Sequence, residues 1–165
     1  MAQNKINYSI WISDPEDAEA IAHADLRALY GYWQDKRAGR LAPTRADIDP
    51  LDFPGILPNI FLLKVLRRKD SPELDFQASL MGTRLVQHMG RDDTGKGFAE
   101  IFRGAPAVTM KVFYDRVAQT GEVCYSQLDA SWMDKKYLFY ERLLLPLSDD
   151  GVTVNRLIGC SLFHR

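Results

Sequence analysis

The side chains that could do chemistry in this sequence are few and scattered. Its three histidines are His23, His88 and His164, and only His88 lies in a segment that we expect near a pocket. A histidine can act as a base or as a metal or haem ligand, but a lone one is more often a packed or surface residue. The best catalytic pair joins His88 with Tyr114 or Asp129, and no spacing fixes its geometry.

No motif for covalent or metal chemistry is present. The serines occupy no Gly-x-Ser-x-Gly turn, and neither Cys124 nor Cys160 has a histidine placed by sequence to activate it. The cysteines stand far apart in apolar stretches, which is typical of reduced, buried small side chains. Two pairs of adjacent aspartates, at 92–93 and 149–150, are expected to bind backbone N–H groups in turns. We therefore predict no catalytic residue and no metal site.

Composition narrows the class of protein. A chain of 165 residues fits one compact domain with an appended element. The formal net charge of -1 gives no electrostatic reason for a nucleic-acid partner, and the basic residues at 67–69 and 135–136 fall where hairpin turns are expected. No apolar run approaches the roughly 20 residues that a membrane span needs. We predict a cytoplasmic protein without a nucleic-acid partner or a membrane span.

An amphipathic helix is predicted near the N-terminus, after a segment that we interpret as an arm or as a short extra strand around 8–12. Its apolar side chains recur at i, i+3, i+4 and i+7, at Leu26, Leu29, Tyr30 and Trp33. A helix that projects from a domain must bury such a stripe, so we expect these four residues in an interface with a second copy. This helix divides the chain into an N-terminal unit at 1–40 and a second unit at 41–165.

The second unit combines strands with helices. Strands are predicted at 60–66, 76–81, 123–133, 137–147 and 152–163. Short helices and one long helix, which Gly121 ends, separate the first two strands from the last three. The simplest assembly is an α+β fold: a five-stranded antiparallel sheet with short helices and one long helix over one face, plus the N-terminal amphipathic helix.

Those helices would enclose a core against the sheet, because several of their apolar side chains must face inward. Polar groups from neighbouring segments could reach the same space. If the core holds a ligand-sized space, we expect it to be lined by Met81, Arg84, Leu85, His88, Met89, Phe98, Phe102, Phe113, Tyr114, Val117, Trp132 and Tyr140. A small apolar or amphipathic molecule would suit such a pocket.

The order of these features resembles a PAS domain, and more narrowly a bacterial PAS subfamily first catalogued as a domain of unknown function. The resemblance runs from about residue 25 to 163. It rests on the helix around Trp33 and on PTRADIDP at 43–50, LPNIFLL at 57–63, MGTRL at 81–85 and GRDDTG at 90–95. It implies a sensory or signalling module whose N-terminal helix often packs in dimers, and it carries over no catalytic residue.

The resemblance leaves the cofactor unknown and disfavours flavin and haem. Light-sensing PAS domains that bind flavin carry a reactive cysteine in a GRNCRFLQ-like run, whereas residues 90–93 here read GRDD. Haem-binding PAS domains place a histidine on the long helix, and this sequence has none between 105 and 121.

Three functions follow from this reading. We expect a stand-alone PAS sensory module that binds a small molecule or a protein partner and changes conformation or oligomeric state, as a homodimer. The first alternative is a ligand-free dimerisation or adaptor domain with a solid core. The second is a small cone-shaped α+β enzyme with His88 in its active site.

Overall fold

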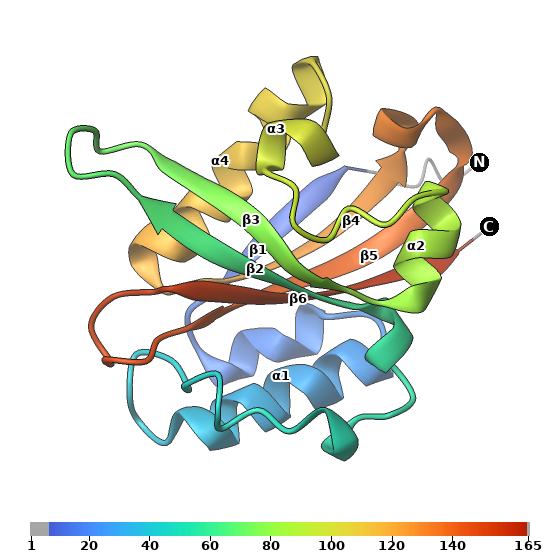
Figure 1. Cartoon of the computed structure of the whole chain (residues 1–165). Coiled ribbons are helices and arrows are strands. Elements are labelled where there is room, and N and C mark those ends of the chain that lie inside the picture. Colours follow the sequence, from blue (N-terminus) through green and yellow to red (C-terminus); the bar gives the residue numbers. More distant parts are fainter. Residues whose placement is uncertain (1–6, 165) are drawn as a thin grey trace.

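The computed structural model describes residues 7–164. Its centre is a six-stranded antiparallel sheet in the order β1-β4-β5-β6-β2-β3, with helices on both faces (Figure 1). The strands are β1 (Tyr8–Ile12), β2 (Ile60–Arg67), β3 (Leu74–Met81), β4 (Val123–Ala130), β5 (Lys135–Leu147) and β6 (Arg156–His164). The α-helices are α1 (Ala24–Arg37), α2 (Thr83–Met89), α3 (Phe98–Ile101) and α4 (Ala105–Thr120). Short 3-10 helices are η1 (Pro15–Ala20), η2 (Pro50–Asp52), η3 (Leu57–Asn59) and η4 (Ser131–Met133).

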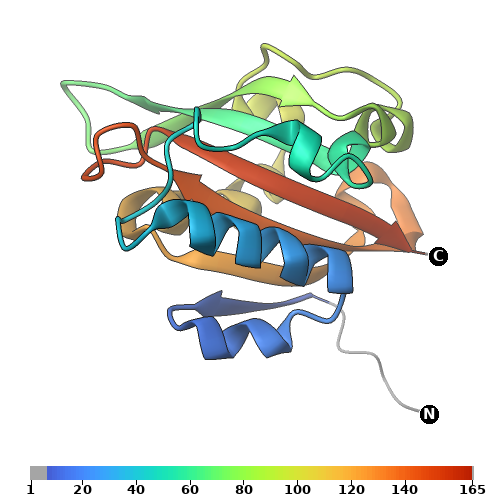
Figure 2. The ribbon, with the colours of Figure 1, turned by 90° about the horizontal axis from the view of Figure 1, so that it is seen from below.

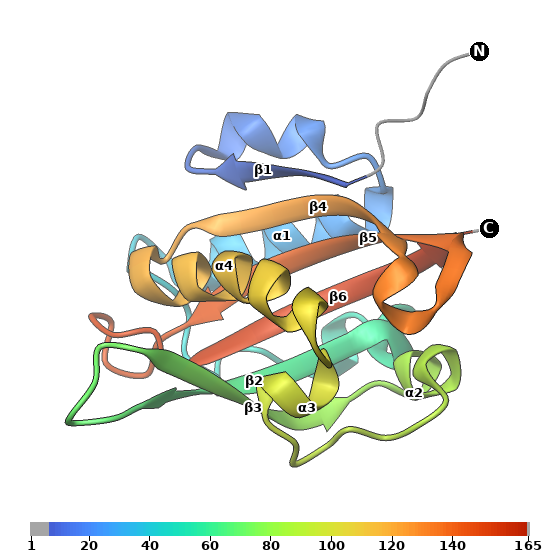
Figure 3. The same ribbon diagram turned by 90° about the horizontal axis from the view of Figure 1, so that it is seen from above.

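The helices α2, α3 and α4 cover one face of the sheet. The long helix α4 lies over β4 and β5, and α3 lies beside β3 (Figure 3). The helix α4 ends where Gly121 adopts a left-handed conformation, as its sequence predicts. Apolar side chains of this layer and of the sheet form one hydrophobic core, which includes Phe76, Phe98 and Tyr114. The predicted α+β fold with short helices and one long helix over one face is confirmed.

The N-terminal helix α1 covers the opposite face of the same sheet (Figure 2). Its stripe of Leu26, Leu29, Tyr30 and Trp33 is buried within the chain, with no member more than 5% exposed. The indole Nε1 of Trp33 donates a hydrogen bond of 2.8 Å to the carbonyl oxygen of Pro146 in β5. The prediction that these residues form a dimer interface is wrong, because the apolar surface that covers them belongs to the same sheet.

The arm before α1 contributes a sixth strand that the five-stranded prediction did not include. The strand β1 pairs with β4 in a register that runs from Tyr8 opposite Gln127 to Ile12 opposite Val123. It thereby covers the edge of β4, which would otherwise expose unpaired backbone groups. Residues 7–40 and 41–164 therefore share one sheet and its cores.

Two predicted strands are shorter than their apolar runs. The run at 123–133 leaves the sheet after Ala130, so that Trp132 lies on η4. The run at 152–163 joins the sheet only at Arg156, because the Asp150 carboxylate accepts hydrogen bonds from the backbone N–H groups of Val152 and Thr153. Side chain to backbone hydrogen bonds of this kind hold a turn where the residue types alone favour a strand.

A close contact between β2 and β6 fixes the floor of the core. Phe61 and Gly159 are partners in register, and the ring of Phe61 lies over the glycine. A Cβ atom at position 159 would be 2.0 Å from the ring, so only glycine leaves Phe61 in this place. With glycine at position 159, the ring of Phe61 can lie between the sheet and the helices, where it is part of the core.

Shortening Trp33 tests whether α1 is an integral part of the fold. We expect Trp33→Ala to lower the free energy of unfolding by about 3–5 kcal/mol, because it removes a buried ring and leaves a cavity. Trp33→Phe should cost less, since it keeps most of the apolar contact and loses only the hydrogen bond to Pro146. Urea denaturation measures both. A Trp33→Ala protein that keeps its stability and only changes its mass in light scattering would contradict this packing.

A second prediction concerns alkaline pH. Burial, with a smaller effect of Asp25, raises the pKa of the Cys160 thiol from 9.0 to about 12. Because the pKa is raised in the folded state, the stability that the fold gains from burying the neutral thiol is fully present below pH 9. Above pH 9 the unfolded thiol ionises first, and stability falls by about 1.4 kcal/mol per pH unit. Urea denaturation between pH 8 and 11 should give a shallower loss for Cys160→Ala than for the natural sequence. Equal slopes would refute the buried thiol.

Candidate ligand-binding site

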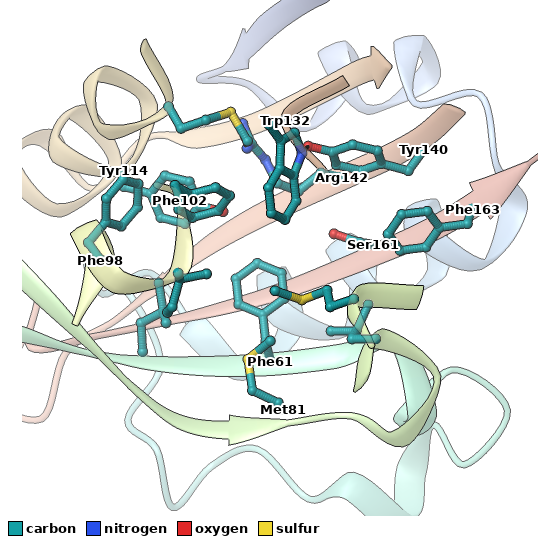
Figure 4. A pocket seen from close by; sticks show the side chains of 15 residues that line it. Phe61, Met81, Phe98, Phe102, Tyr114, Trp132, Tyr140, Arg142, Ser161 and Phe163 are labelled. Carbon is teal, nitrogen blue, oxygen red and sulfur yellow. Dashed lines mark hydrogen bonds between the residues drawn. The ribbon is translucent and has the colours of Figure 1, made fainter. Parts of the chain in front are cut away.

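A cavity of about 50 Å³ lies between the sheet and the layer of α2, α3 and α4. Its lining residues are Phe61, Leu63, Met81, Leu85, Met89, Phe98, Ile101, Phe102, Met110, Tyr114, Trp132, Tyr140, Arg142, Ser161 and Phe163. Figure 4 shows the rings of Phe98, Phe102 and Tyr114 gathered at one end and those of Tyr140 and Phe163 at the other. The surroundings are almost wholly apolar and aromatic, which makes the few polar groups among them informative.

A row of polar residues crosses the sheet beneath this cavity. Arg142 in the middle of β5 is in register with Ser126 of β4 on one side and with Ser161 of β6 on the other. Ser9 of β1 extends the row, because it is in register with Ser126 and their hydroxyl oxygens are 2.6 Å apart. Three of the four residues are buried, and Arg142 is only 1% exposed.

The guanidinium of Arg142 is incompletely bonded. Its Nη2 donates to the Ser126 hydroxyl at 3.3 Å, and its Nη1 points at the Met110 sulfur at 3.7 Å. Its Nε has no hydrogen-bond partner. The charged group also lies 5.0 Å from the ring centre of Tyr114 and 5.6 Å from that of Phe113, distances that suit cation–π contacts. The phenol of Tyr114 and the thiol of Cys124 also interact with the guanidinium. Sulfur atoms, neutral hydroxyl groups and ring faces are weak partners for a buried charge.

No described carboxylate forms an ion pair with Arg142. Burial favours the neutral form of the arginine, but the neighbouring Tyr114 and Tyr140 outweigh this effect and hold its pKa above the ordinary value. Burial raises the pKa of both tyrosines as well, so their phenol groups are protonated at neutral pH and offer dipoles instead of negative charge. The cavity therefore contains a positive charge that the described residues do not neutralise.

The hairpin between β4 and β5 closes the cavity from outside. The Trp132 indole Nε1 donates a hydrogen bond of 2.9 Å to the Tyr140 hydroxyl, which holds the indole ring over the cavity. Tyr140 stacks on Phe163, and Phe163 stacks on the ring of His88, with centroids 4.1 Å apart. Lys135 donates to the carbonyl oxygen of His88 and so links the hairpin to α2.

The loop between α2 and α3 is held by a buried carboxylate. We expected Asp93 to bind backbone groups in a solvated turn, but it is fully buried and bonded by two cations. Arg91 Nε lies 2.7 and 3.0 Å from its two oxygens, and Lys96 Nζ lies 3.1 Å from one of them. Arg91 also donates to the carbonyl oxygen of Ile101, which lines the cavity. This cluster positions one wall of the site.

Eight of the twelve residues that we predicted for the pocket line the cavity. They are Met81, Leu85, Met89, Phe98, Phe102, Tyr114, Trp132 and Tyr140. The other four do not line it. Arg84 is exposed on α2, and His88 is stacked on Phe163. Val117 is buried in the core away from the cavity, and Phe113 lines a groove outside it. The predicted set did not include the other lining residues, which are Phe61, Leu63, Ile101, Met110, Arg142, Ser161 and Phe163. The apolar periodicity of the covering helices pointed to Ile101 and Met110 as inward-facing, whereas the remaining five were missed. An arginine inside the apolar run at 138–147 was the signal for Arg142.

A groove of about 700 Å³ runs along the outer side of this closure, between β1, the beginning of α4 and the β4–β5 hairpin. It shares Met110, Trp132 and Tyr140 with the cavity. Farther out it is lined by Trp11 and Phe113, whose rings stack with centroids 6.3 Å apart. Because Met110 also contacts the guanidinium, its side chain separates the groove from the buried charge.

A second polar cluster lies on the α1 side of the sheet. The Tyr125 hydroxyl donates to the Glu141 carboxylate, whose other oxygen is 2.6 Å from Nε2 of His164. The rings of His164 and His23 stack, which ties the start of α1 to the end of β6. None of these residues lines the cavity, so their arrangement is a connection between elements and does not complete a catalytic site there.

The cavity is smaller than the pockets that hold ligands the size of a flavin or a haem. Its volume is about 50 Å³, whereas pockets for ligands of that size measure at least roughly 300 Å³. No cysteine or histidine is among its lining residues. Within residues 7–164 no three histidine, cysteine or acidic side chains are grouped as metal ligands would be. In the same part of the chain, no helix is long and apolar enough to cross a membrane.

The unneutralised charge has a consequence for stability. We expect Arg142→Met to leave the free energy of unfolding unchanged or to raise it by about 1–4 kcal/mol, because an apolar side chain of similar length ends the cost of burying the charge. Arg84→Met removes the same charge from an exposed position and serves as the control, with a change below about 0.5 kcal/mol. Urea denaturation compares them. A loss of several kcal/mol in Arg142→Met would show that the charge is compensated inside the fold.

Comparison with known proteins identifies the family of this chain. A family model described as PAS domain matches residues 21–162. No curated protein matches the sequence. A solved structure described as "Structure of an RNA-binding Light-Oxygen-Voltage Receptor" is 18% identical with a TM-score of 0.41, over 73% of this chain and 35% of that one. The present chain thus spans about a third of that protein. The match over 21–162 shows that the chain belongs to the PAS domain family, whose members are generally sensory or signalling modules.

Proposed function

We propose that this PAS domain senses a small molecule that binds in the cavity beneath α4. The observation that carries the proposal is a space inside the core that shares Met110, Trp132 and Tyr140 with an open groove. A ligand could reach this space if the side chains of Met110 and Trp132 moved, while the sheet stayed folded. Cavities in protein cores are otherwise few and small, because interiors are close-packed.

Binding would be transmitted by the elements that close the cavity. At about 50 Å³ the space holds a few atoms, so a larger ligand has to displace Met110 or Trp132. Trp132 is held by one hydrogen bond to Tyr140, and Met110 lies in the first half of α4. A ligand that binds only the open arrangement shifts the population toward it. The signal would then be a change in the position of the β4–β5 hairpin and the beginning of α4.

A protein partner is the second candidate, and one observation favours it. Val108 and Val112 lie one helical turn apart on α4 and are 74% and 63% exposed. Apolar side chains at this spacing form a small patch on the helix that also borders the cavity. A signalling protein, or a second copy of this chain, would dock there and respond to a movement of α4.

Native mass spectrometry and thermal-shift screening of the purified protein test ligand binding. We expect a retained or added small molecule that raises the melting temperature. Ser161→Met places a larger side chain in the cavity, so it should abolish this shift in a protein that still folds. Ser13→Met, at an exposed position outside the cavity, should keep the shift.

Two results would contradict the proposal. The first is the absence of any retained or stabilising ligand. The second is a ligand-induced shift that Ser161→Met leaves intact, since binding would then occur elsewhere. The first result would favour the adaptor function, in which the patch of Val108 and Val112 acts alone.

A further inference from the structure

We propose that the ligand of this cavity is a monocarboxylate with an apolar or aromatic body, and that its carboxylate binds Arg142. The inference rests on the proposed function, because it names the chemical class of the molecule that the same site takes. It is carried by the incomplete bonding of the guanidinium inside an aromatic cavity.

The donors of Arg142 match a carboxylate. Nη1 has a thioether sulfur as its hydrogen-bond acceptor, and Nη2 keeps a second N–H group besides the one that it donates to Ser126. These two nitrogens form a fork that is open to stronger acceptors, and Nε adds a donor without a hydrogen-bond partner. A guanidinium presents its N–H groups in a fixed fork that fits the two oxygens of a carboxylate, and such charge-assisted hydrogen bonds are about twice as strong as neutral ones. A neutral alcohol supplies one oxygen and no charge.

Charge and size select a monoanion. Arg142 is the one cationic residue among the lining side chains, and none of the others is acidic. One negative charge would therefore neutralise the site, whereas a phosphate dianion would leave an excess of negative charge in an apolar core. A space of about 50 Å³ takes a group the size of a few water molecules, as a carboxylate is.

The apolar surroundings define the rest of the ligand. Met110 lies between the guanidinium and the groove, so a carboxylate that takes its place at Nη1 leads its own body past α4. That path is bordered by Trp132, Tyr140 and Phe113. Hydrophobic contact with these rings would hold an alkyl chain or an aromatic ring, and the side chain of Met110 is flexible enough to give way.

Pairs of acids and alcohols with the same apolar body distinguish the contribution of the charge to binding from that of the body. Sodium octanoate is compared with 1-octanol, and sodium phenylacetate with 2-phenylethanol, by calorimetric titration of the full chain. We expect at least one acid to bind the natural sequence at least tenfold more tightly than its alcohol. Arg142→Gln should reduce that preference to less than threefold and leave alcohol binding almost unchanged. Arg142→Lys, which keeps the charge but not the fork, should retain part of the preference.

Met110 supplies a second test that leaves Arg142 intact. Met110→Ala removes the side chain that occupies the path, so it should tighten acid binding by at least threefold. Met110→Leu keeps the path filled and serves as the control. These variants also keep the inference testable if Arg142→Gln fails to fold.

The outcomes distinguish the inference from the function on which it rests. Acids and alcohols of equal affinity would overturn the carboxylate and leave a cavity that binds neutral molecules. Acid binding that Arg142→Gln does not weaken would overturn the role of Arg142. If none of the four probes binds either the natural sequence or Met110→Ala, the carboxylate is overturned. The proposed binding function is overturned as well only if native mass spectrometry and thermal-shift screening also find no ligand.

Discussion

The strand β5 is buried on both faces, and the rest of the structure follows from this constraint. Leu143, Leu145 and Leu147 face α1, whereas Leu144 and Tyr140 face α4, and the four leucines have no exposed surface. A strand of this kind is stable only if both of its faces are covered. The helix α1 is therefore required by the sheet, and the two polar residues that interrupt the strand must find their partners inside the protein.

The buried charges of these two residues are bonded in different ways. Glu141 faces the α1 side and is bonded by Tyr125 and His164, so its buried carboxylate is fully engaged. Arg142 faces the α4 side and is surrounded by neutral partners alone: a serine hydroxyl, a phenol, two sulfur atoms and two rings. A polar network that is completely satisfied stabilises and specifies a fold, whereas an incomplete one is a cost that a folded protein tolerates for a reason. This difference between Glu141 and Arg142 indicates that the functional site lies on the α4 side of the sheet.

Much of the fold could be predicted from the sequence, and the exceptions share a physical cause. Periodicity identified the apolar stripe of α1, but a pattern of this kind says which face is buried and does not say what covers it. The left-handed glycine after α4 was predictable because its conformation is local. Most of the pocket residues on the helices were found for the same reason. Arg142, Ser161 and Phe61 were missed because they meet the helices only through the register of β5, β6 and β2, which depends on distant pairings. The burial of Asp93 was not predicted, because exposure cannot be read from a turn sequence alone. Two cations pair with its carboxylate and take the place of water around it.

The contact between Phe61 and Gly159 has an evolutionary consequence. A Cβ atom at this glycine would lie 2.0 Å from the ring of Phe61, so any substitution would displace a ring that lines the cavity. A lineage could therefore lose or reshape its pocket by a single-nucleotide change at a position that touches no ligand. Among relatives of this domain, the residue aligned with Gly159 becomes a simple marker that separates chains with room for a guest from chains whose interior is solid.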